Sequence, residues 1–167
     1  MSARRILIVG GGSAGWMTAA YLQAALSGEG QSPVEIALIE SPDGPRIGVG
    51  EATIPSINHV LSVIGIDELE FLKRVDGTFK QAIKYANWLD GKGESYYHAF
   101  GRYRSSPIDS TSMDWLMSDR SLPFSETISA QPVICDACLA PKTLELADVG
   151  ARFTYAFHMN ALKFADY

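Results

Sequence analysis

The chain has 167 residues, of which 47% are hydrophobic and 20% are charged, a composition typical of a globular domain with a sizeable core. Fourteen Lys and Arg against nineteen Asp and Glu give a net charge of −5, which does not favour binding to nucleic acid or to an anionic membrane. Two cysteines are too few for a disulfide scaffold. These totals predict a cytoplasmic protein.

The first thirty residues contain an uncharged stretch that could be mistaken for a signal peptide or a membrane span. Arg4 and Arg5 precede it, and residues 6–28 carry no charge. Glycines interrupt the stretch in the middle, and no small-residue cleavage site follows it. The pattern therefore predicts a strand over 5–9, buried on both faces, then a glycine turn and a helix over 14–26 that ends at Ser27-Gly28.

A second apolar run, residues 34–40, predicts another strand. Strand, helix and strand in this order predict a parallel pair joined by a crossover helix. The fold class expected is therefore α/β and Rossmann-like.

The turn between the first strand and helix has the spacing Gly10-x-Gly12-x-x-Gly15. The first glycine permits a tight turn, the second lets the backbone approach a pyrophosphate, and the third allows close helix–strand packing. Ser13 and Ala14 open the helix, whose N-terminus favours a phosphate, and Glu40 is placed to accept hydrogen bonds from ribose hydroxyls. We therefore predict dinucleotide binding; a glycine-rich turn kept for packing is the alternative.

The middle of the chain carries two helix-start signals. Thr53 is expected to cap a short helix with Pro55 in its first turn. Asp67 and Glu70 have the spacing of a capping-box variant before a second helix.

A hairpin is predicted next. Strands over 81–89 and 95–100 flank the turn formed by residues 90–93, and this antiparallel pair should lie outside the parallel sheet. Beyond it, residues 113–117 suggest one or two helical turns.

Near the end, residues 153–157 form a third strand candidate, and Asn160 is the expected cap of a final helix. That helix stops after two turns at Tyr167, and two parallel strands are too few for a doubly wound sheet. We therefore expect residues 1–167 to be the N-terminal part of a single domain whose remainder is absent. A short protein with a frayed last helix is the alternative.

Cys135 and Cys138 have the C-x-x-C spacing of a redox pair or half a zinc site. The three histidines are scattered singly along the sequence, so no metal site is predicted.

One further segment, residues 48–55, places two glycines around a valine before a carboxylate and a hydroxyl. Such a loop can lie against a planar ring and offer backbone N–H groups, or it can be a simple turn and cap.

Several stretches resemble the flavin-dependent halogenases, the family that includes the tryptophan halogenases. They run through the whole chain in the family's order: Gly-Gly-Gly-Ser-Ala-Gly-Trp at 10–16, Ile-Glu-Ser at 39–41, Gly-Val-Gly-Glu-Ala-Thr-Ile-Pro at 48–55, Thr-Phe-Lys at 78–80 with Ile83, His-Ala-Phe-Gly at 98–101 and Tyr-Ala-Phe-His at 155–158.

The resemblance implies an FAD-dependent halogenation of an indole- or tryptophan-like aromatic substrate. In the family, reduced FAD and O2 give a flavin hydroperoxide, halide attacks it, and the hypohalous acid moves to a lysine beside the substrate. Lys80 matches that lysine, and Ile83, His98 and Phe100 match the substrate side. An amine can polarise hypohalous acid or be halogenated itself.

The resemblance also assigns the cofactor side and a partner. The loop over the flavin matches Gly48, Val49, Gly50, Glu51, Ala52 and Thr53. A separate flavin reductase is the expected supplier of reduced FAD, with chloride or bromide and O2 as co-substrates.

Two family features are not found in these residues: a Trp-x-Trp-x-Ile-Pro motif and the catalytic glutamate. Both absences fit truncation, and activity is expected of the parent protein but not of this piece alone. The alternatives are another FAD-dependent monooxygenase, which needs no halide, and a truncated, non-catalytic FAD-binding module.

Overall fold

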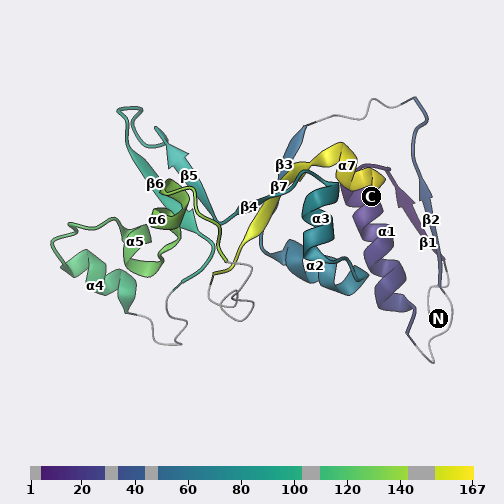
Figure 1. Ribbon diagram of the computed structural model, residues 1–167, viewed down its shortest axis with the longest axis horizontal. Coiled ribbons are helices and arrows are strands. Elements are labelled where there is room, and N and C mark those ends of the chain that lie inside the picture. The colour runs from purple at the N-terminus through teal and green to yellow at the C-terminus, as the bar shows by residue number, and fades with distance from the viewer. Residues whose placement is uncertain (1–4, 29–33, 44–48, 103–109, 143–152) are drawn as a thin grey trace. The chain divides into compact units, whose positions relative to one another are not determined.

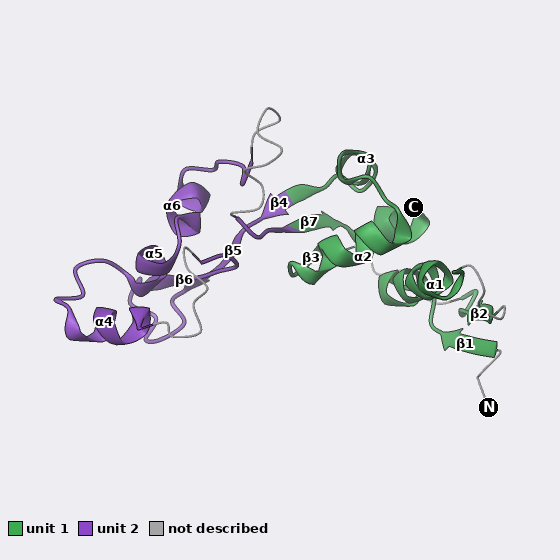
Figure 2. Ribbon diagram, turned by 90° about the horizontal axis from the view of Figure 1, so that it is seen from below, with its two compact units in different colours: residues 1–78, 157–167 green, residues 79–156 purple. Residues whose placement is uncertain are grey.

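A computed structural model describes residues 5–28, 34–43, 49–102, 110–142 and 153–167. The chain forms two compact units, shown in green and purple in Figure 2: unit 1 contains residues 1–78 and 157–167, and unit 2 contains residues 79–156. The mixed α/β fold, with a parallel pair of strands and with antiparallel pairs in other sheets, confirms the predicted fold class. That residues 1–167 belong to one larger domain stays a prediction.

Figure 1 labels the elements in chain order. Unit 1 contains β1 (Arg5–Val9), α1 (Ser13–Leu26), β2 (Glu35–Ile39), β3 (Gly50–Ala52), α2 (Ser56–Ile64), α3 (Glu68–Arg74), β7 (Ala156–Asn160, from its second residue) and α7 (Ala161–Asp166). Unit 2 contains β5 (Ala82–Ala86), β6 (Ser95–Ala99), α4 (Thr111–Met117), α5 (Phe124–Ile128) and α6 (Gln131–Asp136), and β4 (Thr78–Lys80) lies where the chain passes from unit 1 to unit 2.

The first strand, helix and strand form as the sequence predicts. β1 and β2 are parallel and in register from Arg5 opposite Glu35 to Val9 opposite Ile39, and α1 packs on this pair. The expectation that β1 is buried on both faces is wrong. Leu7 and Val9 are 57% and 81% exposed, because among the described residues α1 covers one face of the pair and nothing covers the other.

Two of the three predicted helix caps are confirmed. The Asp67 carboxylate accepts a hydrogen bond from the Glu70 backbone N–H at 2.9 Å, at the start of α3. Asn160 accepts from the backbone N–H groups of Leu162 and Lys163 at 3.1 and 3.2 Å, at the start of α7. These caps were predictable because donor and acceptor lie within three residues of each other.

The third cap, Thr53, is wrong. α2 begins at Ser56 with Pro55 before it and no side-chain cap. The Thr53 hydroxyl instead donates to the Phe157 carbonyl and accepts from the Phe157 N–H, both at 3.0 Å. β3 and β7 are antiparallel here, with Ala52 opposite His158 and Gly50 opposite Asn160. The strand predicted over 153–157 therefore begins three residues later, where β3 offers a partner.

The core of unit 1 is aromatic. Phe71 and Phe157 are fully buried with ring centroids 5.2 Å apart, and Phe164 meets Phe71 edge-on at 5.7 Å. Ile57 and Leu61 of α2, Val75 at the end of α3 and Ala161 of α7 are also buried, so the core of unit 1 draws on three helices as well as on β7.

Unit 2 is built on the predicted hairpin. β5 and β6 pair antiparallel from Ala82 opposite Ala99 to Ala86 opposite Ser95, in a sheet of their own. The helical turns expected near residues 113–117 are α4. The helices α5 and α6 were not predicted, because each spans less than two turns and shows too little periodicity to read from sequence.

In the part of the chain that the structure describes, no helix combines the length and the apolar character needed to cross a membrane.

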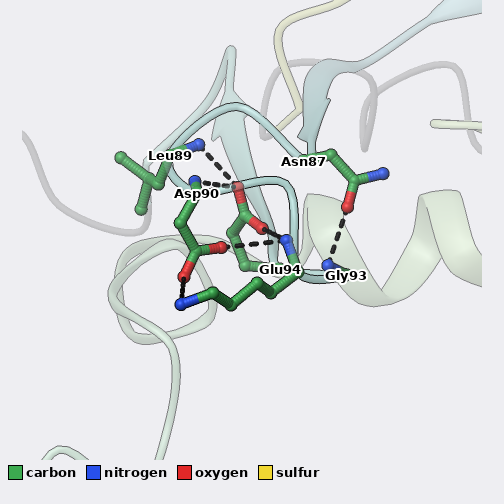
Figure 3. A network of polar contacts seen from close by, with 6 residues as sticks. Asn87, Leu89, Asp90, Gly93 and Glu94 are labelled. Atoms are coloured by element: carbon green, nitrogen blue, oxygen red, sulfur yellow. Dashed lines mark hydrogen bonds and ion pairs between the residues drawn. The ribbon is translucent and has the colours of Figure 1, made fainter.

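The turn of the hairpin is held by a carboxylate (Figure 3). Glu94 accepts hydrogen bonds from the backbone N–H groups of Leu89 and Asp90 at 2.5 and 3.0 Å, and from that of Lys92 at 3.1 Å. Asn87 accepts from the Gly93 N–H at 2.8 Å. These backbone donors, that of Asp90 foremost, lower the pKa of Glu94 from 4.5 to about 2.

We predict that the Glu94 carboxyl stays ionised well below its ordinary pKa. Because the folded pKa is lowered, the bonds stabilise the turn fully above about pH 4.5 and are lost as the pH falls through about 2. The Glu94 side-chain carbon should show no titration by NMR between pH 6 and 3.5, where a carboxyl with an unshifted pKa becomes about nine-tenths protonated. A Glu94→Gln control should shift the amide signals of Leu89 and Asp90 at neutral pH. A Glu94 midpoint near 4.5 contradicts this account.

Candidate functional site

The glycine turn after β1 has the geometry that the sequence predicts. Gly10 has φ +117°, a conformation that side chains rarely adopt, and its N–H donates to the Ile39 carbonyl at 2.8 Å. A Cβ on Gly15 would lie 1.8 Å from the Gly10 carbonyl oxygen, so the start of α1 packs closely against the turn. A Cβ on Gly12 would meet nothing within 4 Å. A Cβ on Gly10 would also meet nothing within 4 Å, so the open space lies at Gly10 and at Gly12, the glycine expected to face a phosphate.

Glu40 lies directly after β2, against this turn. A Cβ on Gly11 would lie 1.7 Å from the Glu40 Oε2 atom, so the carboxylate rests on the backbone of the turn. An exposed carboxylate there can accept hydrogen bonds from hydroxyl groups next to a bound pyrophosphate. The Ser13 hydroxyl is directed toward α7, where it donates to the Ala161 carbonyl at 3.4 Å. Ala14 is exposed in the first turn of α1.

The segment expected to lie over the flavin is in part a strand and not a loop. Gly50, Glu51 and Ala52 form β3, and their backbone pairs with β7. Val49 is 52% exposed, its carbonyl accepts from the Ala161 N–H at 3.2 Å, and Gly48 lies outside the described residues. This pairing fixes the path of the backbone that would face a ring.

Unit 1 also holds a cavity of about 410 Å³ between α1, α7 and the end of α2. Its lining is mainly apolar, with Trp16, Ile64 and Phe164 among the residues. Ser13 is the one predicted cofactor residue among those that line it.

Lys80 ends β4 and is half-buried. Its Nζ atom lies 5.4 Å from the centroid of the Phe100 ring, within the range of a cation–π contact. Phe79, the residue before it, meets Tyr155 edge-on with ring centroids 5.2 Å apart. The structure therefore brings together Lys80 and Phe100, two of the residues predicted for the catalytic and substrate sites.

Ile83 and His98 are the other two residues predicted for the substrate side, and they lie opposite each other across β5 and β6. Phe100 follows β6, and its N–H donates to the Gln81 carbonyl at 3.1 Å, so the pairing continues one step beyond the strand. His98 is exposed, whereas Phe100 is half-buried. The residues at positions 80, 83, 98 and 100 therefore lie along one end of the hairpin.

An exposed polar cluster joins the same hairpin to α6. Asp136 forms an ion pair with Lys84 at 2.9 Å and accepts from the Tyr97 hydroxyl at 2.5 Å. The Tyr97 hydroxyl bond, followed by that of Lys84, holds the pKa of Asp136 below its usual range. The Asp136 carboxylate in turn raises the pKa of Lys84.

The cysteine pair lies beside this cluster, at the end of α6. Burial raises the pKa of the half-buried Cys135 thiol, which disfavours the reactive thiolate. Both cysteines are free, and the described residues contain no group of three or more His, Cys, Asp or Glu side chains that could hold a metal ion.

Sequence reasoning missed two residues that hold this region together. Gln131 is fully buried and bonded at both ends of its side chain, and Gln81 donates to the Leu139 carbonyl at 2.8 Å. A buried glutamine inside a short, irregular helix gives no sequence signal, because its partners are backbone atoms more than twenty residues away.

We predict that the glycines of the turn differ sharply in what they tolerate. Gly15→Ala should lower the free energy of unfolding by about 2 kcal/mol or more, since its Cβ collides with the Gly10 carbonyl. Gly12→Ala, the matched control, should cost less than about 1 kcal/mol, the loss of glycine at a helix N-cap. Urea titration followed by tryptophan fluorescence measures both. Equal losses would show that the close packing at Gly15 is not significant.

Comparison with known proteins identifies the family to which the chain is similar. Residues 5–167 match the tryptophan halogenase family. The tryptophan 7-halogenase RebH of Lentzea aerocolonigenes is 38% identical over 183 residues, covering 98% of this chain and 33% of that protein. The tryptophan 6-halogenase ThaL of Streptomyces albogriseolus is 35% identical over 182 residues, with the same coverage of both chains.

Solved structures agree. The crystal structure of a tryptophan halogenase from Shewanella frigidimarina has a TM-score of 0.84 at 38% identity, over 98% of this chain and 33% of that one. The chain spans about a third of the length of the curated relatives it matches. With the family matched from β1 to the last residue, the chain belongs to the tryptophan halogenase family.

Proposed function

We propose that the protein is a flavin-dependent halogenase that halogenates an indole-like aromatic substrate, with Lys80 as its catalytic residue. The observation that carries the proposal is the pairing of Lys80 with Phe100 in a family whose relatives are named tryptophan halogenases. A half-buried amine against an aromatic face is suited to handling an electrophile beside a flat substrate.

FAD is the proposed cofactor, and the residues of unit 1 fit it. Gly10 and Gly12 leave space for a pyrophosphate at the N-terminus of α1, and the Glu40 carboxylate lies where it can accept from ribose hydroxyls. The stretch from Gly48 to Thr53 would contact the ring system. When bound and reduced, the flavin supplies, with O2 and halide, the hypohalous acid.

Lys80 then directs this oxidant. Its ammonium can donate a hydrogen bond to the oxygen of hypohalous acid and polarise the O–halogen bond. Alternatively, its free amine can exchange a proton for the halogen, releasing water, and pass the halogen to the ring in return for the ring proton. Either route converts an aromatic C–H and hypohalous acid into an aryl halide and water. Ile83, His98 and Phe100 would position the ring, and a separate flavin reductase would supply reduced FAD.

We predict that Gly12→Val in the full gene product weakens FAD binding at least tenfold, or by about 1.4 kcal/mol. The added side chain would occupy the space proposed for a pyrophosphate, and its Cβ atom would have no protein atom within 4 Å. Fluorescence titration of FAD measures the affinity. Ala24→Val, on an exposed part of α1, is the control and should bind FAD normally. Unchanged affinity in a folded Gly12→Val variant removes the glycine turn from the cofactor site.

We predict that Lys80→Ala lowers halogenated product to background while FAD binding and the O2-dependent oxidation of reduced flavin continue. Lys80→Arg should not restore product, because a guanidinium stays protonated. Lys84→Ala is the matched control, since Lys84 also lies over an aromatic ring, with Nζ 4.9 Å from the Tyr97 centroid, but is exposed.

The measurement is product mass spectrometry at constant reduced flavin, with indole and bromide, and with bromide omitted. Near-normal product from Lys80→Ala overturns the catalytic assignment. A hydroxylated product that forms without bromide would show that the protein is a flavin monooxygenase instead.

A further inference from the structure

Gln131 is the most completely buried polar side chain in the described part of unit 2. Its exposed fraction is 0%, and both the oxygen and the nitrogen of its amide are hydrogen-bonded. The Oε1 atom accepts from the Gly101 backbone N–H at 2.5 Å, and the Nε2 atom donates to the Thr154 carbonyl at 2.7 Å. A buried amide with both ends satisfied fixes the two backbone segments that it joins.

Those two segments carry the rings that pack on the Phe79-Lys80 pair. Gly101 follows Phe100, whose ring lies under the Lys80 Nζ atom at 5.4 Å. Thr154 precedes Tyr155, whose ring meets Phe79 at 5.2 Å. One side chain thus sets the position of the backbone next to each ring.

The start of α6 is itself held rigidly. The Gln131 backbone N–H donates to the Ser129 hydroxyl at 3.1 Å, and the fully buried Pro132 occupies the first turn of α6, where proline is favoured. At the other end of this helical segment the Leu139 carbonyl accepts from the Gln81 side chain, and Gln81 directly follows Lys80. The residue that follows Lys80 is therefore tied by its side chain to the end of the α6 segment.

From this arrangement we propose that Gln131 is a positioning residue for the proposed halogenation: its amide holds Phe100 under Lys80, and so sets where the lysine delivers the halogen. The proposal rests on the function proposed above for Lys80. Transfer of a reactive halogen depends on the placement of Lys80 to within a fraction of an ångström, so a small shift of the Phe100 backbone should release the oxidant before it reaches the substrate.

Two variants of the full gene product test the positioning role, one at each partner of the hydrogen bond between Gln131 and Gly101. Gln131→Leu removes both amide hydrogen bonds and puts an apolar side chain of similar volume in the same buried site. Gly101→Ala is milder, because its Cβ would lie 3.2 Å from the Gln131 Oε1 atom and 3.4 Å from the Thr154 N atom, so it displaces the same contact by a few tenths of an ångström. If Gln131→Leu does not fold, Gly101→Ala still decides the question.

The first readout is spectroscopic and does not depend on activity. In protein labelled with 13C at the lysine ε position, the Phe100 ring should shift the Lys80 signal upfield. Lys84, over the Tyr97 ring in the same unit, provides an internal control. Both variants should move the Lys80 signal toward the value of an exposed lysine and leave the Lys84 signal unchanged.

The second readout is the fate of the oxidant. Halogenated product per reduced flavin oxidised should fall about tenfold in Gln131→Leu, while hypohalous acid captured by a scavenger rises correspondingly. Val75→Ala, at a fully buried position in unit 1, is the control for lost stability and should keep this ratio at the wild-type value.

An unchanged Lys80 signal and an unchanged ratio in both variants would overturn the proposal. Equal loss of the Lys80 and Lys84 signals would also overturn it, since unit 2 would then simply have loosened. If Lys80→Ala itself keeps full product, the proposed function fails, whereas the Lys80 signal still reports whether Gln131 holds Phe100 in place.

Discussion

The structure of unit 1 depends on the hydrogen bonds between Thr53 and Phe157, two residues 104 positions apart in sequence. Three bonds join them, because the Thr53 N–H also donates to the Phe157 carbonyl at 2.9 Å. They pair β3 with β7 and place the Phe157 ring in the core against Phe71. Pairing residues so distant costs loop-closure entropy, and burial of the two rings offsets that cost.

The same pairing also positions the residues at the end of β7 and the start of α7. Once β7 is paired, Asn160 lies where its N–H donates to the Val75 carbonyl and its side chain caps α7. The Ala161 N–H then meets the Val49 carbonyl, and its own carbonyl accepts from Ser13 at the glycine turn. The proposed flavin-binding residues of β1–α1 and of β3 are thus connected through the first residues of α7, a link that neither motif reveals by itself.

Elements whose signals are local could be predicted from the sequence. The Gly10 turn needs a positive φ, which glycine supplies, and Asp67 and Asn160 cap helices within three residues of themselves. Thr53 has the same local sequence signal as these caps, but its hydroxyl bonds to the distant residue Phe157 and not to the start of α2. The strand expected over 153–157 failed for the same reason, because its register is set by β3 and not by its own apolar residues.

In the candidate site, too, residues with a local sequence signal could be predicted and those with distant partners could not. Lys80 and Phe100 could be named from the sequence because they stand in motifs, and the structure shows that they are in contact. Gln131, which fixes the backbone next to Phe100, could not be predicted, because its partners are backbone atoms of the distant residues 101 and 154. Sequence patterns report side chains that repeat or alternate, whereas a buried amide that joins two loops leaves no such pattern.

Links from α6 reach the hairpin through Asp136, which is bonded to Lys84 and Tyr97, and through Gln131, and a comparison of their energies shows which one fixes the geometry of the hairpin. The Lys84–Asp136 pair is exposed at both ends, so water and salt screen it and its contribution is small. Gln131 is fully buried, and its loss would leave the buried Gly101 N–H without this partner, at about 1–3 kcal/mol, and would also remove the part-buried bond to the Thr154 carbonyl. The cost of moving the Phe100 backbone is therefore set by an uncharged amide in the interior, and the ion pair at the surface contributes little to it.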